Sequence, residues 1–234
     1  MANLSLQVPA NMTIAAILFD LDGTLANTDP IHFQTWQDLL KDYGMDIDKA
    51  FYQSRISGGL NGEIVQDILP QLSPEAGKRV AEEKEARFRQ LGTQLERLGG
   101  LDDVLTWTEE GGVKRALVTN APPENVEFML EVLQLGDRFD VKVLAENAPI
   151  GKPDPTPYNL ALEQLGISPA GAIAFEDSPA GIRAAVGAGI YTIGVATTHD
   201  PHKLLDLGAG MAIADFTDAD LWQRLLRRSH LPSV

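Results

Sequence analysis

The sequence predicts an α/β protein in which a doubly wound, mostly parallel sheet carries an inserted α-helical domain. Short apolar runs, each long enough for one buried strand, alternate with segments that have the apolar spacing of helices. Several helical segments begin with proline and are followed by glycine. One long stretch, residues 31–98, has helical patterns without a convincing buried strand. Regular alternation of strands and helices is typical of parallel sheets with helices on both faces.

The first predicted strand is the apolar run at residues 14–19, which is apolar enough to be buried on both faces. The other apolar runs lie at 113–118, 141–144, 172–175 and 190–195, with a possible sixth strand at 211–214. Helices are expected between them at about 102–110, 124–133, 156–165 and 180–188. These segments together form one predicted α/β domain, residues 1–30 and 99–234.

Residues 31–98 interrupt this alternation and predict an inserted helical cap domain. Helical patterns occur at 31–43, 63–69 and 73–98, and the last of these carries a dense run of charges. An insertion beside the carboxyl ends of the strands would lie over the ligand crevice of such a sheet and could act as a lid.

Composition excludes several classes of function. The chain has 234 residues and a formal net charge of −14, so its surface repels nucleic acid. Three arginines, Arg224, Arg227 and Arg228, are interpreted as favourable charges at a helix C-terminus. The sequence has no cysteine, which excludes disulfides and thiolate metal sites. The sequence has no apolar segment typical of a secretory signal or a membrane span, so we expect a cytoplasmic protein. A monomer is the default expectation. Residues 1–11 have no evident role.

Two of the buried strands end in pairs of acidic residues. Asp20 and Asp22 follow the first strand, and Glu176 and Asp177 follow the fourth. Carboxylates that converge at one edge of a parallel sheet repel each other, and a hard divalent cation such as Mg²⁺ resolves that repulsion. The alternative is that these residues are helix caps and loop carboxylates.

Two further segments carry polar groups suited to a phosphoryl group. Thr119 and Asn120 follow the second strand, where a hydroxyl and an amide can hydrogen-bond phosphoryl oxygens, although the pair is also an ordinary turn and cap. Lys152 lies between a glycine and a proline before a helix. Its charge would offset both the carboxylates and a phosphate, unless it is an ordinary loop lysine.

Taken in order, these segments resemble the four motifs of the haloacid dehalogenase superfamily of phosphohydrolases. The motifs read Asp-Leu-Asp-Gly-Thr-Leu at 20–25, Thr-Asn at 119–120, Gly-Lys-Pro at 151–153 and Phe-Glu-Asp-Ser at 175–178. The resemblance covers about residues 14–194, and the insertion is placed as in the helical cap subtype of the superfamily.

The resemblance implies a role for each motif residue. Asp20 is implied as the nucleophile that becomes an aspartyl-phosphate, and Asp22 as the general acid and base. The presence of Asp22 favours phosphoryl transfer over dehalogenation, because a halide leaves without a proton. The implied Mg²⁺ ligands are Asp20, Asp22 through its backbone carbonyl, Glu176 and Asp177. Thr119 and Lys152 are implied to bind the phosphoryl group, with Thr24 and Asn120 as further substrate-binding candidates, and Lys152 also restrains Asp20.

The insertion is similar to that of β-phosphoglucomutase and sugar-phosphate phosphatases, which implies substrate-binding roles for His32, Trp36, Gly59, Asn61 and Lys84. From spacing alone, Trp36 is equally a core residue, the loop with Gly59 a plain turn, and Lys84 a salt-bridged surface lysine. Mutases have an arginine where Asn61 stands. A neutral side chain there argues against a permanent clamp for a second phosphate.

Three short runs, Asp-Pro-Ile-His at 29–32, Glu-Lys-Glu-Ala at 83–86 and Thr-Asn-Ala-Pro at 119–122, are most similar to plant-type sugar-phosphate phosphatases. The resemblance therefore implies a Mg²⁺-dependent phosphatase of broad specificity that acts on small sugar or polyol phosphate monoesters. Three alternatives remain open. They are a β-phosphoglucomutase-type phosphomutase, a dedicated phosphoglycolate phosphatase and a non-catalytic binding module.

Overall fold

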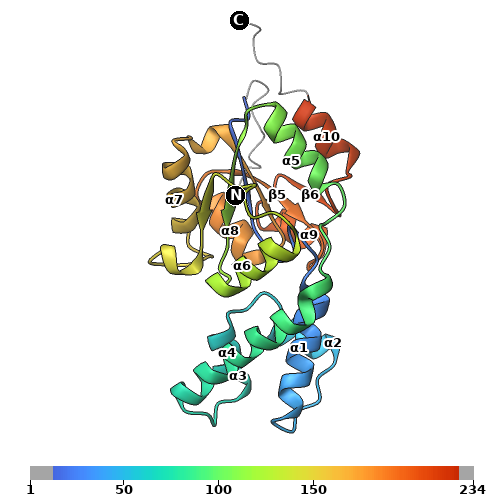
Figure 1. Cartoon of the computed structure of the whole chain (residues 1–234), viewed down its shortest axis with the longest axis vertical. Helices are drawn as coiled ribbons and strands as arrows, with labels where there is room; N and C mark the ends of the chain where they lie inside the picture. Colours follow the sequence, from blue (N-terminus) through green and yellow to red (C-terminus); the bar gives the residue numbers. More distant parts are fainter. Residues whose placement is uncertain (1–12, 227–234) are drawn as a thin grey trace, which may run out of the picture. The chain divides into compact units, whose positions relative to one another are not determined.

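The computed structural model describes residues 13–226 (Figure 1), so the interpretations of residues 1–11, Arg227 and Arg228 lie outside the described part of the chain. The chain divides into two compact units. Among the described residues, one unit contains those up to Asn27 together with those from Glu96 onward, and the other is Thr28–Leu95. Within residues 13–226, no helix has the length and apolar character needed to cross a membrane.

The first unit is built on a six-stranded sheet in which every neighbouring pair of strands is parallel. The strand order is β3-β2-β1-β4-β5-β6. The bounds are β1 (Ala16–Phe19), β2 (Lys114–Val118), β3 (Val141–Val143), β4 (Ala172–Glu176), β5 (Tyr191–Val195) and β6 (Met211–Ile213). All six predicted strands form, and the α/β prediction is confirmed. The order places β1 between β2 and β4, which fixes what surrounds the residue that follows it.

Helices lie between the strands of this unit along the chain, and one more helix follows the last strand. They are α5 (Leu101–Glu110), α6 (Pro123–Val132), α7 (Thr156–Leu165), α8 (Pro179–Gly187), α9 (Pro201–Asp206) and α10 (Ala219–Leu226), with short 3-10 turns at Ala145–Asn147 and Pro169–Gly171. Both faces of the sheet are buried, as expected for parallel strands. On one face Ala16 and Leu18 of β1 belong to a core cluster with Tyr158 of α7 and Ala184 of α8.

The other face of β1 packs through aromatic rings. The ring of Phe19 is stacked on that of Phe175, with centroids 5.5 Å apart, and it also contacts the rings of Phe139 and Phe216. Successive side chains of a strand point to opposite faces, so one apolar run supplies both cores. Side chains therefore pack against both faces of β1, and the polar residues at the strand ends follow directly from this packed region.

The second unit consists of α1 (Asp29–Lys41), α2 (Lys49–Arg55), α3 (Asn61–Ile68) and α4 (Pro74–Leu91), followed by a 3-10 turn at Gly92–Gln94. Its core contains Trp36, Leu39, Tyr52, Ile64 and Val80, among others. The absence of a strand between residues 31 and 98 agrees with the prediction.

Two predictions for this unit are corrected. The helix predicted at 73–98 ends at Leu91, because Gly92, a poor helix former, caps it and a 3-10 turn follows. The short helix α2 was not predicted. It spans seven residues, and its N-cap is Asp48, whose side chain accepts a hydrogen bond from the Phe51 N–H.

Candidate active site

The candidate site of the α/β unit lies where three neighbouring strands end. Asp20 follows β1 directly, Thr119 follows β2, and Glu176 is the last residue of β4. Because β1 lies between β2 and β4, Asp20 has Thr119 on one side and Glu176 on the other. All three side chains are buried. Ligands of open parallel sheets bind at such an edge.

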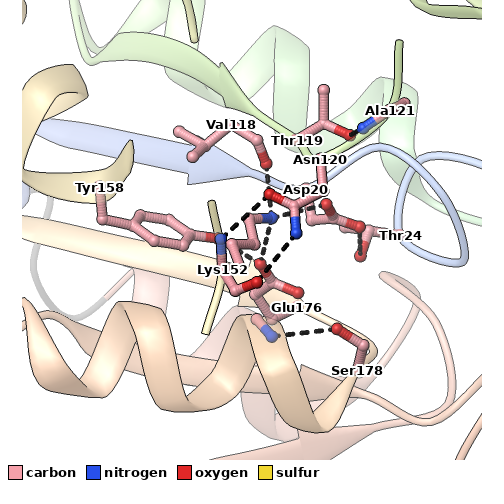
Figure 2. A network of polar contacts seen from close by, with 11 residues as sticks. Asp20, Thr24, Val118, Thr119, Asn120, Ala121, Lys152, Tyr158, Glu176 and Ser178 are labelled. Atoms are coloured by element: carbon pink, nitrogen blue, oxygen red, sulfur yellow. Dashed lines mark hydrogen bonds and ion pairs between the residues drawn. The ribbon is translucent and has the colours of Figure 1, made fainter. Parts of the chain in front are cut away.

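Lys152, from the loop before α7, donates to three acceptors at this edge (Figure 2). Its Nζ lies 2.7 Å from Asp20 Oδ1, 2.5 Å from Glu176 Oε1 and 2.7 Å from the backbone oxygen of Val118. An ammonium has three protons, so each acceptor takes one. Burial lowers the pKa of Lys152, but the carboxylates of Asp20 and Glu176 outweigh it and raise that pKa above its ordinary value. Lys152 is therefore a fixed positive charge.

The backbone of Lys152 is held by Asn120. The Lys152 N–H donates to Asn120 Oδ1 at 3.0 Å, and Asn120 Nδ2 donates to the Lys152 oxygen at 3.1 Å. A Cβ on Gly151 would lie 2.9 Å from Asn120 Oδ1, so only glycine leaves room for this pairing. In this structure Asn120 positions Lys152, and its contact with a substrate stays a prediction.

The hydroxyls of Thr119 and Thr24 also face this edge. Thr119 Oγ1 accepts a hydrogen bond from the Ala121 N–H at 3.0 Å, and this bond does not use the proton of the Thr119 hydroxyl. Thr24 is fully buried, and its Oγ1 lies 3.5 Å from Asp20 Oδ2. Figure 2 shows Thr24 beside the Asp20 carboxylate. The hydroxyl of Thr24 thus contacts the predicted nucleophile, whereas its predicted contact with substrate is untested.

The acidic residues form a buried cluster with excess negative charge. Carboxylate oxygens of Asp20, Glu176 and Asp177 lie within 4.8 Å of one another. Burial raises the pKa of Asp20 to about 7, with Lys152 lowering it and Glu176 raising it. Burial, followed by the charges of Asp20 and Glu176, also raises the pKa of Asp177 well above its ordinary value. Three carboxylates thus face one ammonium.

These residues fit a divalent cation. Glu176 Oε2 is buried and has no hydrogen-bond partner among the described residues, which is costly unless another group satisfies it. Oxygen donors and excess negative charge suit Mg²⁺. Asp22 is only partly buried, and its side chain is not among the three clustered carboxylates. The expectation that Asp22 would use its backbone carbonyl stays a prediction.

In the helical unit, His32, Asn61 and Lys84 meet at one polar cluster that also contains Glu85. Lys84 is 3% exposed, and its Nζ lies 2.9 Å from both His32 Nδ1 and Glu85 Oε1. Asn61 Nδ2 donates to the same Glu85 oxygen. The ring of His32 is stacked on Phe88 at 4.3 Å between centroids. Lys84 is therefore salt-bridged as one interpretation held, but it is a buried residue and not a surface one.

Trp36 and Gly59 both have local packing roles. Trp36 is 2% exposed and lies in the apolar core of its unit, as the core alternative held, and its contact with a substrate stays a prediction. A Cβ on Gly59 would lie 3.1 Å from the backbone oxygen of Ile56 and from Ile64, so the turn packs tightly there. Gly59 is thus accounted for by packing, and its contact with substrate stays a prediction.

Comparison with known proteins assigns the family. The sequence model of the haloacid dehalogenase-like hydrolases matches residues 17–195. The phosphorylated carbohydrates phosphatase of Thermotoga maritima is 34% identical over 201 residues, which cover 83% of this chain and 91% of that protein. The fructose-1-phosphate phosphatase YqaB of Escherichia coli is 33% identical over 185 residues, covering 77% and 96% of the two chains. This chain belongs to the haloacid dehalogenase-like hydrolase family.

Solved structures of the family share its fold. CbbY from Rhodobacter sphaeroides, in complex with xylulose-(1,5)bisphosphate, has a TM-score of 0.78 and 27% identity, covering 88% of this chain and 96% of that one. A β-phosphoglucomutase from Clostridium difficile has the same TM-score with 26% identity, covering 91% and 96%. The haloacid dehalogenase-like core predicted from the motifs is confirmed.

Two residues near this haloacid dehalogenase-like site were not predicted. Thr198 Oγ1 donates to Asp177 Oδ2 at 2.5 Å, and Thr197 Oγ1 donates to the Gly23 oxygen at 2.5 Å. A Cβ on Gly23, whose φ is +72°, would overlap the Asp177 carboxylate. The signal was present, because the two threonines follow β5 just as the acidic pairs follow β1 and β4.

A third residue that was not predicted is Tyr158 of α7. Its ring lies in the core under the sheet, and its hydroxyl donates to Glu176 Oε1 at 2.6 Å (Figure 2). Sequence periodicity places Tyr158 on the apolar face of its helix, where it is expected to be a core residue. Nothing in the pattern indicates that its hydroxyl reaches a carboxylate.

Proposed function

We propose that this chain is a Mg²⁺-dependent phosphatase that hydrolyses small sugar or polyol phosphate monoesters through an aspartyl-phosphate on Asp20. The observation that carries the proposal is the pairing of Asp20 with Lys152 at 2.7 Å, between the ends of β2 and β4. A buried carboxylate held by one fixed positive charge and bordered by acidic metal ligands is suited to attack an anionic phosphorus centre.

In the first step, Asp20 attacks phosphorus. A bond forms between the Asp20 carboxylate oxygen and phosphorus, and the bond from phosphorus to the ester oxygen breaks. Asp22, two residues along the chain, gives its proton to the departing alcohol oxygen. The Thr119 hydroxyl and the Lys152 charge bind the phosphoryl oxygens. Because all three protons of Lys152 already have acceptors, its contribution to the phosphoryl group is mainly electrostatic.

In the second step, Asp22 takes a proton from water, whose oxygen attacks phosphorus. The bond from Asp20 to phosphorus then breaks, inorganic phosphate leaves, and the Asp20 carboxylate is restored. Asp20, Glu176, Asp177 and the backbone carbonyl of Asp22 are the proposed ligands of Mg²⁺. When bound, Mg²⁺ supplies positive charge that offsets the repulsion between these carboxylates and the anionic ester.

The proposed substrate class rests on the relatives and on the charge of the helical unit. The relatives named above act on phosphorylated carbohydrates and on fructose 1-phosphate, and two yeast relatives, 28–29% identical, are named 2-deoxyglucose-6-phosphate phosphatases. We propose that His32, Gly59, Asn61 and Lys84 of the helical unit contact the sugar. The predictions of a cytoplasmic location and a monomer are retained as part of this proposal.

The charge balance around Lys84 supports a neutral alcohol group over a second anionic group. Although burial raises it, the Lys84 charge and hydrogen bond bring the pKa of Glu85 below its ordinary value, so Glu85 is ionised. One positive and one negative charge therefore neutralise each other, and the Asn61 amide already bonds Glu85. A bisphosphate or a glycolate carboxylate would meet no net positive charge in this cluster. This disfavours the mutase and the phosphoglycolate phosphatase alternatives.

The test is phosphate release from a panel of hexose, pentose, glycerol and glycolate phosphates, with Mg²⁺ and with EDTA. We expect Mg²⁺-dependent release from several sugar and polyol phosphates and little from 2-phosphoglycolate. Conversion of β-glucose 1-phosphate into glucose 6-phosphate with little phosphate release would replace the proposal by the phosphomutase. Absence of release from every ester would favour a non-catalytic module.

A further inference from the structure

Tyr158 connects the helical layer under the sheet to the acidic cluster. The side chain is fully buried, and its ring packs in the core with residues of β1 and α8. Its hydroxyl donates to Glu176 Oε1 at 2.6 Å. A carboxylate oxygen has no proton to give, so the tyrosine hydroxyl is the donor in this bond.

The two oxygens of Glu176 are in different situations. Oε1 accepts two hydrogen bonds, one from Tyr158 and one from Lys152 at 2.5 Å. Oε2 is buried and accepts none from the described residues. The backbone of α8 lies directly against this carboxylate, because a Cβ on Gly181 would overlap it. Two donors on one oxygen and a helix backbone against the group leave the carboxylate little freedom to rotate.

We propose that Tyr158 is a positioning residue that, together with Lys152, holds Glu176 Oε1 so that Oε2 is presented to the divalent cation. This inference rests on the proposed function, since it assumes that Mg²⁺ binds at the acidic cluster. A hydrogen-bonded partner behind a metal-binding carboxylate fixes its orientation and supports metal affinity. Lys152 gives Glu176 only one of its three hydrogen bonds, since it also donates to Asp20 and to the backbone oxygen of Val118. The hydrogen bond from Tyr158 is therefore a second restraint on Glu176.

The hydroxyl is not needed for packing. The ring of a phenylalanine would fill the same space in the core, so a tyrosine that merely fills volume could lose its oxygen with little effect on the site. If instead the hydroxyl orients Glu176, its loss should appear in cation binding more than in stability. This difference separates a positioning role from a structural one.

The test measures Mg²⁺ binding to the full chain by isothermal titration calorimetry. The variants are Tyr158→Phe, Glu176→Gln and the two combined. Tyr52→Phe is the matched control, since Tyr52 is a buried tyrosine of the helical unit whose hydroxyl donates to a carboxylate, Asp29 Oδ1, at 2.7 Å. We expect the Mg²⁺ dissociation constant to rise about tenfold in Tyr158→Phe, as for other partners of metal ligands, and to stay unchanged in Tyr52→Phe.

Two further readouts complete the test. The urea midpoints of the two Tyr→Phe variants should fall by similar amounts, and the Mg²⁺ concentration that gives half-maximal phosphate release should rise in Tyr158→Phe in parallel with the dissociation constant. In the Glu176→Gln background, removing the Tyr158 hydroxyl should have no further effect on Mg²⁺ affinity, because the two residues act as one unit.

An unchanged Mg²⁺ dissociation constant in Tyr158→Phe would overturn the inference and leave the proposed function intact. A full additional loss in the Glu176→Gln background would also overturn it, since Tyr158 would then act by another route. If the wild-type chain neither binds Mg²⁺ nor needs it for phosphate release, the proposed function fails first and the inference fails with it.

Discussion

The ammonium of Lys152 lies 2.7 Å from Asp20 Oδ1, although 132 residues separate the two in the sequence. The fold brings them together because β1 is central in the sheet, while Asn120, at the end of β2, holds the Lys152 backbone beside it. The predicted restraint of Asp20 by Lys152 is thus a direct contact. Because of this contact, replacing either residue should change the charge and position of the other.

Replacing Lys152 by methionine should remove the fixed positive charge while keeping most of the side-chain volume. Three buried carboxylates would then face no cation, so we expect the free energy of unfolding in EDTA at pH 8 to fall by about 3 kcal/mol. We also expect kcat/KM to fall by about 10²–10³-fold. Lys142→Met is the control, because Lys142 is exposed and donates only to the Gly136 oxygen. Equal effects of the two variants would contradict the role of Lys152.

Replacing Asp20 by asparagine should change how the stability of the metal-free protein depends on pH. The pKa of Asp20 is raised from 3.8 to about 7, so the folded chain keeps a proton that the unfolded chain loses between about pH 4 and 7. The contribution of Asp20 is therefore present in full below pH 4 and lost as pH rises to 7. Asparagine does not titrate.

Urea unfolding in EDTA at pH 5 and pH 8 checks this prediction. The free energy of unfolding of Asp20→Asn relative to wild type should be higher at pH 8 than at pH 5, by at most about 2.5 kcal/mol. Added Mg²⁺ should reduce the difference, because a cation also relieves the charge of Asp20. A difference that is the same at both pH values would show that Asp20 titrates normally.

Much of the fold was predictable because its signals are local. Helix α7 has the predicted bounds, since Pro155 and Pro157 start it and Gly166, with φ +67°, ends it. The four inner strands were visible as apolar runs, since central parallel strands are buried on both faces, whereas the edge strands β3 and β6 are only partly buried and gave weaker signals. Helix α2 was missed because seven residues carry too little periodicity to be distinguished from a turn.

The site was predictable only where residues follow strand ends or match a motif. Asp20, Glu176 and Asp177 were found in this way, and so was Lys152. Partners that approach through space were not. Glu85 looks like one charge in a solvated run, yet the fold turns it onto Lys84 and Asn61. Such contacts depend on how helices pack, which no local pattern encodes.

Gly181 should be intolerant of a side chain although it lies within α8. Gly181→Ala would push a methyl group into the Glu176 carboxylate, so we expect a loss of about 1–3 kcal/mol in stability and of Mg²⁺-dependent activity. Gly187→Ala, in the same helix, is the control. A Cβ there meets only Pro155 at 3.6 Å, and alanine should stabilise the helix by up to about 1 kcal/mol. Thermal unfolding of both variants checks the contrast.

Glu85→Gln should change substrate selectivity by leaving the Lys84 charge uncompensated. We expect the ratio of kcat/KM for 2-phosphoglycolate to that for fructose 1-phosphate to rise about tenfold, which is about 1.4 kcal/mol of discrimination. Glu82→Gln is the control, because Glu82 is exposed and lies 3.8 Å from the exposed Lys78. An unchanged ratio would show that the charge balance around Lys84 does not determine substrate specificity.

The most direct measurement is mass spectrometry of the chain quenched in acid during turnover of a sugar phosphate. The proposed mechanism predicts one added phosphoryl group on the peptide that contains Asp20, which is lost when turnover is allowed to finish and is absent from Asp20→Asn. A phosphoryl group on another residue, or a retained rate of phosphate release in Asp20→Asn, would contradict an aspartyl-phosphate on Asp20.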